Sequence, residues 1–512
     1  MNYKKLGKIL GKIMILEGIL MVFPLLISLI YKEGVTNALA FLIPIAALIL
    51  IGFLLQIPKP KRNVLYQKEG FALTALVWIV MTLFGAIPFV INRDIPSYVD
   101  ACFEIMSGFT TTGASIVNDV TILSRSTLFW RSFSHWIGGM GILVFVLIFI
   151  PESNDGSSMH LLRAESPGPQ VGKIVSKMKA TTRILYLIYL GLTVLEFLFL
   201  VCAPKLIAGC STGDKVFYSL LATFGSAGTG GFSFVAGSME LFTPYSQYVI
   251  AIFLLLFGIN FSLYYLILIG KFRDVFRSEE LRTYIIIAIT AIALVFTSLM
   301  TKMSSVYTTE AAFRHSLFQV ASIITTTGYS TTDFNLWPMT AVTVLVVLMF
   351  IGAMAGSTAG GIKTSRIVIA VKGAYVNVRK LINPRYVPKV KFEGKTLEEK
   401  TINDVFSFIT LYLFILIAVT FLLSFDPSNG TMATISSNAG TYEQTHGFFS
   451  NFSAALSCIS NIGPGFETVG AYASFSAYNP FSKILLTLTM LIGRLEILPV
   501  LILFSPKTWK KV

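Results

Sequence analysis

Hydrophobic residues along this chain fall into long runs that short polar segments separate. Ten runs are each roughly 20 residues or longer, at approximately 9–31, 36–57, 71–91, 128–150, 183–203, 245–270, 283–301, 337–371, 403–425 and 479–504. A helix of about 20 apolar residues crosses the ~30 Å hydrocarbon core of a bilayer. Because lipid offers no partner to a backbone amide, a spanning segment must be helical or part of a closed barrel. The pattern predicts ten transmembrane helices.

The first run has an alternative explanation as a secretory signal peptide, since four lysines precede it. The segment YKEG that follows it offers no small-residue cleavage site. We therefore interpret residues 9–31 as a retained span.

Four shorter apolar runs lie between the spans, at about 98–112, 214–229, 310–327 and 446–462. Each is too short to cross the bilayer and is predicted to be re-entrant. From residue 71 onward, the order of span, short run, glycine-bearing loop and span occurs four times, which indicates an internal repeat. We expect two extra helices over 1–70, a first repeat over 71–152, a second over 153–282, a third over 283–400 and a fourth over 401–512.

The loops that follow the short runs read TTTGAS (Thr110 to Ser115), GTGGFS (Gly228 to Ser233), TTTGYS (Thr325 to Ser330) and SNIGPGF (Ser460 to Phe466). A re-entrant helix would direct the negative end of its dipole at its loop, which favours a cation there. These loops contain no carboxylate, so backbone carbonyls and hydroxyls would have to hold the ion, as in a selectivity filter. Glycine allows the backbone angles that align such carbonyls. The predicted filter residues are Thr110, Thr111, Thr112, Gly113, Thr229, Gly230, Thr326, Thr327, Gly328, Asn461, Ile462 and Gly463.

A simpler explanation of each loop is that its glycine merely ends a helix. Four glycines at matching positions, each after a short run and before a span, favour a pore instead. The ring is expected to be unequal, because only the first and third loops carry the full TTTG. We therefore expect fewer well-defined ion sites than four identical subunits would provide.

Composition and charge support a membrane protein. Of the residues, 54% are hydrophobic and 13% charged, against about 45–50% and about 25% in soluble domains. The net charge of +14 arises from Lys and Arg concentrated in alternate connections, which predicts a multi-pass protein with both termini cytoplasmic. Dispersed charges argue against nucleic-acid binding. The four cysteines lack the spacing of a metal site, and we expect unlinked thiols.

Further motifs extend the pattern, namely SHWIGGMGI (Ser134 to Ile142), HLLRAESPGP (His160 to Pro169), AGSTAGGIK (Ala355 to Lys363) and GRLEILP (Gly493 to Pro499). With these motifs and the four loops, the chain resembles the Trk/Ktr/HKT superfamily of potassium transporters, and its two extra N-terminal helices resemble the TrkH type. The resemblance implies an all-α integral membrane fold with four fused span-pore-span repeats around a pseudo-fourfold pore. It also implies a bacterial cytoplasmic membrane location, a potassium ion bound at the filter residues, a homodimer, and cytosolic nucleotide-binding regulatory subunits that are TrkA-like. In plant relatives a serine at the first filter glycine accompanies sodium transport, so Gly113 favours potassium.

The run at 337–371 contains a glycine-rich segment that interrupts its helical pattern. A continuous helix from Trp337 to about Asn377 would measure roughly 61 Å, twice the hydrocarbon core. Close helix packing through GxxxG spacing and a non-helical loop are both compatible with the sequence. The resemblance implies a gating loop below the filter, with candidate residues Gly352, Gly356, Ser357, Thr358, Gly360, Gly361 and Lys363.

Arg494 lies inside the last apolar run, where a cation costs from about 3 to over 10 kcal/mol unless it faces water or a partner. It could pair with Glu496 or Glu196, or cap carbonyls between helices. The resemblance instead implies a position below the filter, where its charge would repel a passing cation.

Other polar residues near the loops have simpler explanations. Asp119, Asp333 and Glu467 follow the filter glycines and could attract cations, but solvated loop carboxylates are the simpler interpretation. For His135, we expect structural capping in preference to proton coupling.

The pattern favours channel-like potassium uptake, gated by the intramembrane loop and Arg494. The alternative is potassium symport with sodium or protons by alternating access. An enzyme is not expected, because the sequence has no HExxH motif and no paired intramembrane aspartates. No nucleotide-binding motif is apparent, so regulation by nucleotide would require another polypeptide, which could dock on 372–400 or the HLLRAESPGP loop.

Overall fold

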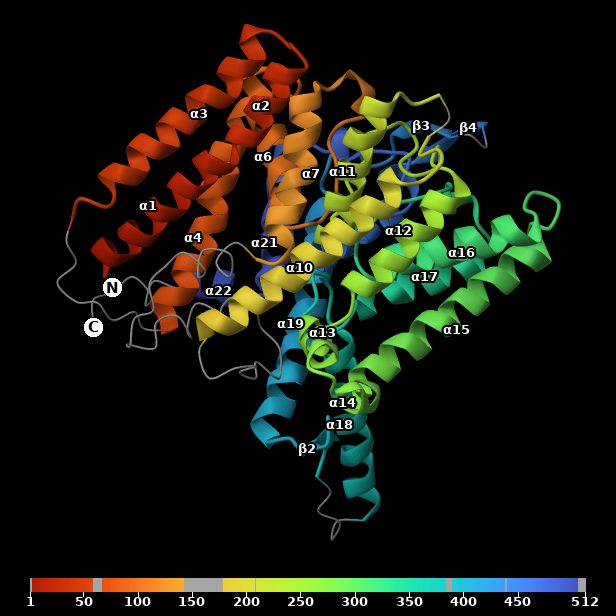
Figure 1. The fold of residues 1–512 in the computed structure, drawn as a ribbon. Coiled ribbons are helices and arrows are strands. Elements are labelled where there is room, and N and C mark those ends of the chain that lie inside the picture. Colours follow the sequence, from red (N-terminus) through yellow and green to blue (C-terminus); the bar gives the residue numbers. More distant parts are fainter. Residues whose placement is uncertain are drawn as a thin grey trace.

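The computed structural model describes residues 2–58, 67–141, 178–207, 209–383, 389–437 and 440–504, and these are mostly helical. Two N-terminal helices form a hairpin at one side of the bundle (Figure 1). The first is bent at Met21 into α1 (Tyr3–Leu20) and α2 (Val22–Ile30), and α3 (Val35–Leu54) returns beside it. These helices cover the predicted runs 9–31 and 36–57.

The first long helix of each repeat matches its predicted span. These helices are α4 (Gln67–Gly85) with its short continuation α5 (Ile87–Ile91), α10 (Met178–Val201), α15 (Glu279–Lys302) and α19 (Glu399–Leu423). Together with the two N-terminal helices, they make six in the described part of the chain that are long and apolar enough to cross a membrane. The hydrophobic pattern located them correctly because each is a continuous apolar run.

The four short apolar runs also form helices, namely α6 (Tyr98–Phe109), α11 (Thr212–Gly228), α16 (Thr309–Ile324) and α20 (Phe448–Ser460). In α6, α11 and α16, a Ser or Thr hydroxyl caps the first turn and an acidic residue lies within that turn. Both features stabilise a helix N-terminus. All four helices end directly at the glycine-bearing loops.

The second long run is interrupted in the second, third and fourth repeats, whereas we expected only 337–371 to be broken; in the first repeat, the corresponding helix ends at Gly139. The outer helices are α7 (Arg125–Gly139), α12 (Pro244–Phe257), α17 (Met339–Ile351) and α21 (Pro480–Arg494), with 13 to 15 residues each. The helix therefore breaks inside the predicted spans 245–270 and 479–504, and the two parts of the first are together long and apolar enough to form one bent span. Residues 142–150 of the fourth predicted run lie outside the described residues.

Local backbone geometry describes two of these breaks. The chain bends by 92° between α12 and α13 (Phe261–Leu268), where the Asn260 side chain caps the new helix by accepting from the Ser262 N–H at 2.8 Å. Between α21 and α22 (Leu498–Phe504), Glu496 and Ile497 adopt positive φ angles of 54° and 70°. Apolar residues lie on both sides of each bend, so hydropathy alone did not reveal them.

Each outer helix packs between the short helix of its own repeat and that of the next. Thus α7 lies against α6 and α11, α12 against α11 and α16, α17 against α16 and α20, and α21 against α20 and α6. The last contact returns to the first repeat, so the four repeats close into a ring.

Short connecting elements extend the bundle at opposite ends in Figure 1. At one end, α14 (Phe272–Arg277) and α18 (Thr364–Ile382) lie near the two-stranded pair β1 (Lys391–Phe392) and β2 (Lys395–Thr396). At the other end, β3 (Met432–Ser437) and β4 (Gly440–Thr445) form an antiparallel hairpin. Four 3-10 turns complete the described elements: η1 (Val120–Ile122), η2 (Phe334–Leu336), η3 (Glu467–Val469) and η4 (Phe475–Ala477).

Candidate ion site

The four loops that follow the short helices share one backbone conformation. Each begins with a left-handed residue whose φ lies between 53° and 56°, and two positions later each has a glycine with φ between 70° and 105°. The N–H of each left-handed residue bonds the carbonyl three residues earlier, and the next N–H bonds the carbonyl five residues before it. The left-handed residues are Thr111, Thr229, Thr326 and Asn461, and the glycines are Gly113, Gly231, Gly328 and Gly463.

By this equivalence, the glycine of the second loop is Gly231, one residue after the predicted Gly230. Gly231, with φ of 70°, corresponds to Gly113, whereas Gly230 corresponds to Thr112 and has no positive φ. A Cβ built on Gly230 would overlap the imidazole of His135. The segment TGG offers two consecutive glycines, and the sequence alone could not distinguish them.

Each of the four glycines approaches a carbonyl oxygen of the next loop, and the four contacts form a closed cycle. A Cβ on Gly113 would overlap the carbonyl oxygen of Gly230, one on Gly231 that of Thr327, and one on Gly328 that of Ile462. A Cβ on Gly463 would lie 2.7 Å from the carbonyl oxygen of Thr112, which returns the cycle to the first loop. Thr112, Gly230, Thr327 and Ile462 occupy equivalent positions, so four equivalent carbonyls lie beside four equivalent glycines.

Side chains hold three of the loops in two different ways. Hydroxyl pairs stabilise the first and third loops, with Thr110 to Thr112 at 2.8 Å and Thr325 to Thr327 at 2.9 Å. In the fourth loop, Asn461 donates to the Thr112 hydroxyl and to the Met490 carbonyl, both at 2.9 Å. The second loop has neither a hydroxyl pair nor such an amide, because glycines stand where the first loop has Thr110 and Thr112.

The glycine-rich segment between α17 and α18 is non-helical and lies against the third and fourth loops. The N–H of Gly360 donates to the Thr326 hydroxyl at 2.7 Å, and a Cβ on Gly360 would overlap the Ser460 carbonyl. Close helix packing through GxxxG spacing therefore does not apply here. The segment begins at Gly352, whose φ of 69° ends α17.

Several of the candidate gate residues contact other residues of this segment or of the elements packed against it. The Ser357 hydroxyl donates to the Met354 carbonyl at 2.6 Å, and the Lys363 ammonium donates to the Ala359 carbonyl. Gly356 approaches the Asn260 side chain, and Gly361 approaches Gly352. Other elements also hold the segment, because the Ala355 N–H donates to the Glu280 carboxylate at 2.7 Å and the Met354 N–H donates to the Gly258 carbonyl at 3.2 Å.

Arg494 connects three repeats at the end of α21. Its guanidinium donates to the Thr358 carbonyl at 3.0 Å, to the Gly139 carbonyl at 2.9 Å, and to the Gly138 carbonyl. These partners belong to the glycine-rich segment and to the end of α7. Glu496, one of the pairing alternatives, forms its ion pair with Arg366 instead.

Two charged residues beside the ring form an ion pair that the sequence did not predict. Glu104 in α6 and Arg131 in α7 are 0% and 1% exposed, and their side chains form an ion pair at 2.7 Å. Charged residues within apolar segments are a usable signal for function, and Glu104 and Arg131 both lie inside predicted apolar runs. His135, for which we expected capping, bonds the Gly108 carbonyl at 2.9 Å.

The three acidic residues that follow the loop glycines differ in environment. Asp119 is exposed, and the Thr121 hydroxyl and N–H lower the pKa of its carboxyl. Asp333 is buried and accepts from the Tyr442 hydroxyl at 2.7 Å, while Glu467 accepts from Ser450 at 2.7 Å. Asp333 therefore binds the β3–β4 hairpin and Glu467 binds the first turn of α20, whereas Asp119 is an exposed carboxylate.

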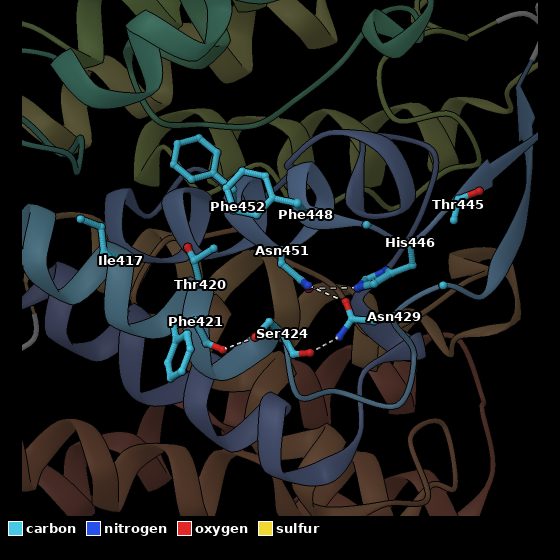
Figure 2. Close-up of a pocket in the computed structure, with 12 residues that line it drawn as sticks. Ile417, Thr420, Phe421, Ser424, Asn429, Thr445, His446, Phe448, Asn451 and Phe452 are labelled. Carbon is cyan, nitrogen blue, oxygen red and sulfur yellow. Dashed lines mark hydrogen bonds between the residues drawn. The ribbon is translucent and has the colours of Figure 1, made fainter.

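A separate pocket of about 770 Å³ lies between α19 and the N-terminal end of α20. Figure 2 shows His446, Asn451 and Asn429 pointing toward one another at its polar side, with Phe421, Phe448 and Phe452 at its apolar side. The two asparagine side chains are joined at 2.6 Å, and Asn451 reaches His446 at 3.1 Å. The pocket lies at the end of α20 opposite the fourth loop.

Comparison with known proteins agrees with this architecture. Residues 37–511 match the TrkH family, described as a cation transport protein. The Trk system potassium uptake proteins TrkH and TrkG of Escherichia coli (strain K12) are 33% and 31% identical, over 100% of both chains for TrkH, and over 98% of this chain and 97% of TrkG. The crystal structure of the potassium transporter TrkH from Vibrio parahaemolyticus superposes with a TM-score of 0.84 at 28% identity, and covers 100% of both chains. By these matches over nearly its whole length, the chain belongs to the TrkH family of cation transport proteins.

Proposed function

We propose that this protein takes up potassium across the cytoplasmic membrane by a channel-like route through the ring of four loops. The observation that carries the proposal is the closed cycle in which four equivalent carbonyls lie beside four equivalent glycines. The relatives named above are potassium uptake proteins. The function is therefore transport and not catalysis.

The geometry supports a carbonyl-lined filter. Carbonyl oxygens can replace the water shell of a potassium ion. The C-terminal ends of α6, α11, α16 and α20 all meet these loops, and each contributes a partial negative charge of about half a unit. Since the four loops are held differently, we expect unequal contributions from them to ion binding.

The proposed gate consists of the glycine-rich segment and Arg494. The segment contacts Thr326 and Ser460 in two of the loops, and Arg494 holds it through the Thr358 carbonyl. A guanidinium at this position would repel a cation that leaves the ring. Movement of the segment would release this obstruction.

Orientation and partners belong to the same proposal. The excess of Lys and Arg in alternate connections favours cytoplasmic termini, and it assigns α18 and β1–β2 to the cytoplasmic end and β3–β4 to the outside. We propose a homodimer with TrkA-like nucleotide-binding subunits that dock near residues 372–400. The other candidate docking loop, HLLRAESPGP, lies outside the described residues.

Coupled symport with sodium or protons is the alternative mechanism. A pure conductance has a reversal potential that follows the potassium gradient alone. A coupled transporter has a reversal potential that shifts with the second ion. Current measurements on the purified chain in bilayers distinguish the two.

The test of the filter is rubidium and sodium flux into liposomes that contain the purified chain, with and without Gly113→Ser. The added side chain would overlap the Gly230 carbonyl, so we expect the preference for rubidium over sodium to fall about tenfold or more, which corresponds to about 1.4 kcal/mol. Gly430→Ser is the matched control, because Gly430 has a φ of 83°, against 81° for Gly113, and nothing lies within 4 Å of its added Cβ. An unchanged preference in Gly113→Ser would refute the filter.

A further inference from the structure

The second loop is held by two buried polar side chains from the outer helix of the first repeat. Arg131 and His135 are four residues apart in α7 and thus lie on one face of it. Arg131 donates to the Ser233 carbonyl at 2.9 Å, and its guanidinium lies 4.3 Å from the centre of the Phe232 ring. His135 accepts the Phe232 N–H at 3.2 Å. Both side chains therefore hold the chain just after Gly231.

Glu104 extends this contact to the first loop. Its carboxylate accepts from Arg131 and also from the Ser115 hydroxyl at 3.0 Å and the Ile116 N–H at 2.8 Å. The Glu104–Arg131 ion pair thus ties the residues after Gly113 to those after Gly231. We refer to Glu104, Arg131 and His135 as the polar brace.

The hydrogen bonds of His135 define its protonation. Because Nε2 accepts the Phe232 N–H, it carries no proton, and Nδ1 donates its own to the Gly108 carbonyl. The neutral ring therefore connects the end of α6 to the second loop. The same ring fills the space that a Cβ on Gly230 would need.

The other three repeats have no counterpart to the polar brace. Counted from the helix N-caps Ser124, Thr243, Pro338 and Asn479, the position of Arg131 is occupied by Ile250, Leu345 and Leu486, and that of His135 by Leu254, Met349 and Met490. Counted back from the left-handed loop residues, Glu104 corresponds to Ala222, Gln319 and Ala454. The brace is thus confined to the repeat that faces the second loop, which lacks both the hydroxyl pair and the amide of the other loops.

Buried charges are costly within a membrane protein, and an ion pair often offsets only part of its desolvation. In the second and fourth repeats, apolar residues occupy the positions of both charges, and in the third repeat both residues are uncharged. We propose that Glu104, Arg131 and His135 are positioning residues that set ion preference by holding the Gly230 carbonyl in the ring. This inference rests on the proposed function of the ring as a filter.

The test replaces the brace with residues that the third repeat already carries at these positions. Glu104→Gln with Arg131→Leu removes both charges together, because the loss of one partner would leave an unpaired buried charge. His135→Met is the second variant. Trp136→Phe is the matched control, since its indole N–H bonds Thr193 in α10 at 3.3 Å and not the loops.

Rubidium and sodium fluxes are measured in liposomes with the full chain. We expect the preference for rubidium to fall about tenfold in the double variant and in His135→Met, about the effect of one lost hydrogen bond, with Trp136→Phe unchanged. A second readout is thermal stability in potassium against sodium, because an ion that binds the folded ring stabilises it by mass action. The extra stabilisation by potassium should shrink in the brace variants, whereas a merely structural role would lower stability equally in both salts.

The outcomes separate this inference from the proposed function. If Gly113→Ser loses the preference while a folded brace variant keeps it, the filter stands and the brace is refuted. If the double variant does not fold, His135→Met decides alone, and an unchanged preference there refutes the inference. If the parent protein itself does not prefer rubidium, the proposed filter falls and the brace falls with it.

Discussion

Neutralising Arg494 should increase potassium flux. Its guanidinium bonds three carbonyls from two other repeats, those of Gly138, Gly139 and Thr358. At about 5 Å and an effective dielectric constant of about 20, a unit charge repels a potassium ion by roughly 3 kcal/mol. Such a barrier slows passage by more than about 100-fold. The carbonyl partners offset part of the charge, so for Arg494→Gln we expect an increase of about tenfold or more.

The assay is rubidium uptake into liposomes at equal protein content, with Arg494→Lys as the charge-preserving control. A lysine keeps the positive charge but cannot reproduce the planar fork that binds several carbonyls. If repulsion is the cause, Arg494→Gln is faster than the parent and Arg494→Lys is not. Equal acceleration in both variants would assign the effect to the tether on Thr358, and no acceleration in Arg494→Gln would refute a gating role for the charge.

Gly231, the hydrogen bond between Tyr442 and Asp333, and His446 in the pocket each allow a further prediction. Gly231→Ala should lower the rubidium preference about tenfold or more, because a Cβ would overlap the Thr327 carbonyl; liposome flux with Gly430→Ala as control checks this, and a parental ratio would contradict it. Tyr442→Phe removes the hydroxyl that donates to Asp333 and should lower the free energy of unfolding by about 1–2 kcal/mol. Denaturant unfolding in detergent measures this loss, and an unchanged free energy of unfolding would contradict the role of the hydrogen bond. Burial lowers the pKa of His446, so the folded state disfavours its protonation, and its contribution is complete above the ordinary value of about 6.5 and falls as pH decreases below it. The Tm of the parent should therefore fall more between pH 7.5 and 5.5 than that of His446→Gln, and equal decreases would contradict this.

The apolar runs determined much of the fold from sequence alone. Six spans were predicted correctly, because a continuous run of apolar residues must form a helix wherever lipid surrounds it. The four short helices were located for the same local reason, since the length of each apolar run and the glycine that follows it can be read directly from the sequence. The glycine-rich interruption after Ile351 also followed from composition, because glycine and hydroxyl residues are poor helix formers.

Only the tertiary structure decided which residues meet across the repeats. Gly231 replaced Gly230 because the register of a loop depends on contacts with the Thr327 carbonyl and the His135 ring, which belong to other repeats. The partners of Arg494 and the pairing of Glu104 with Arg131 join residues far apart in the chain, and no local spacing encodes them. The hydropathy of a segment is set by its own residues, whereas the geometry of the ring depends on how four segments pack against one another.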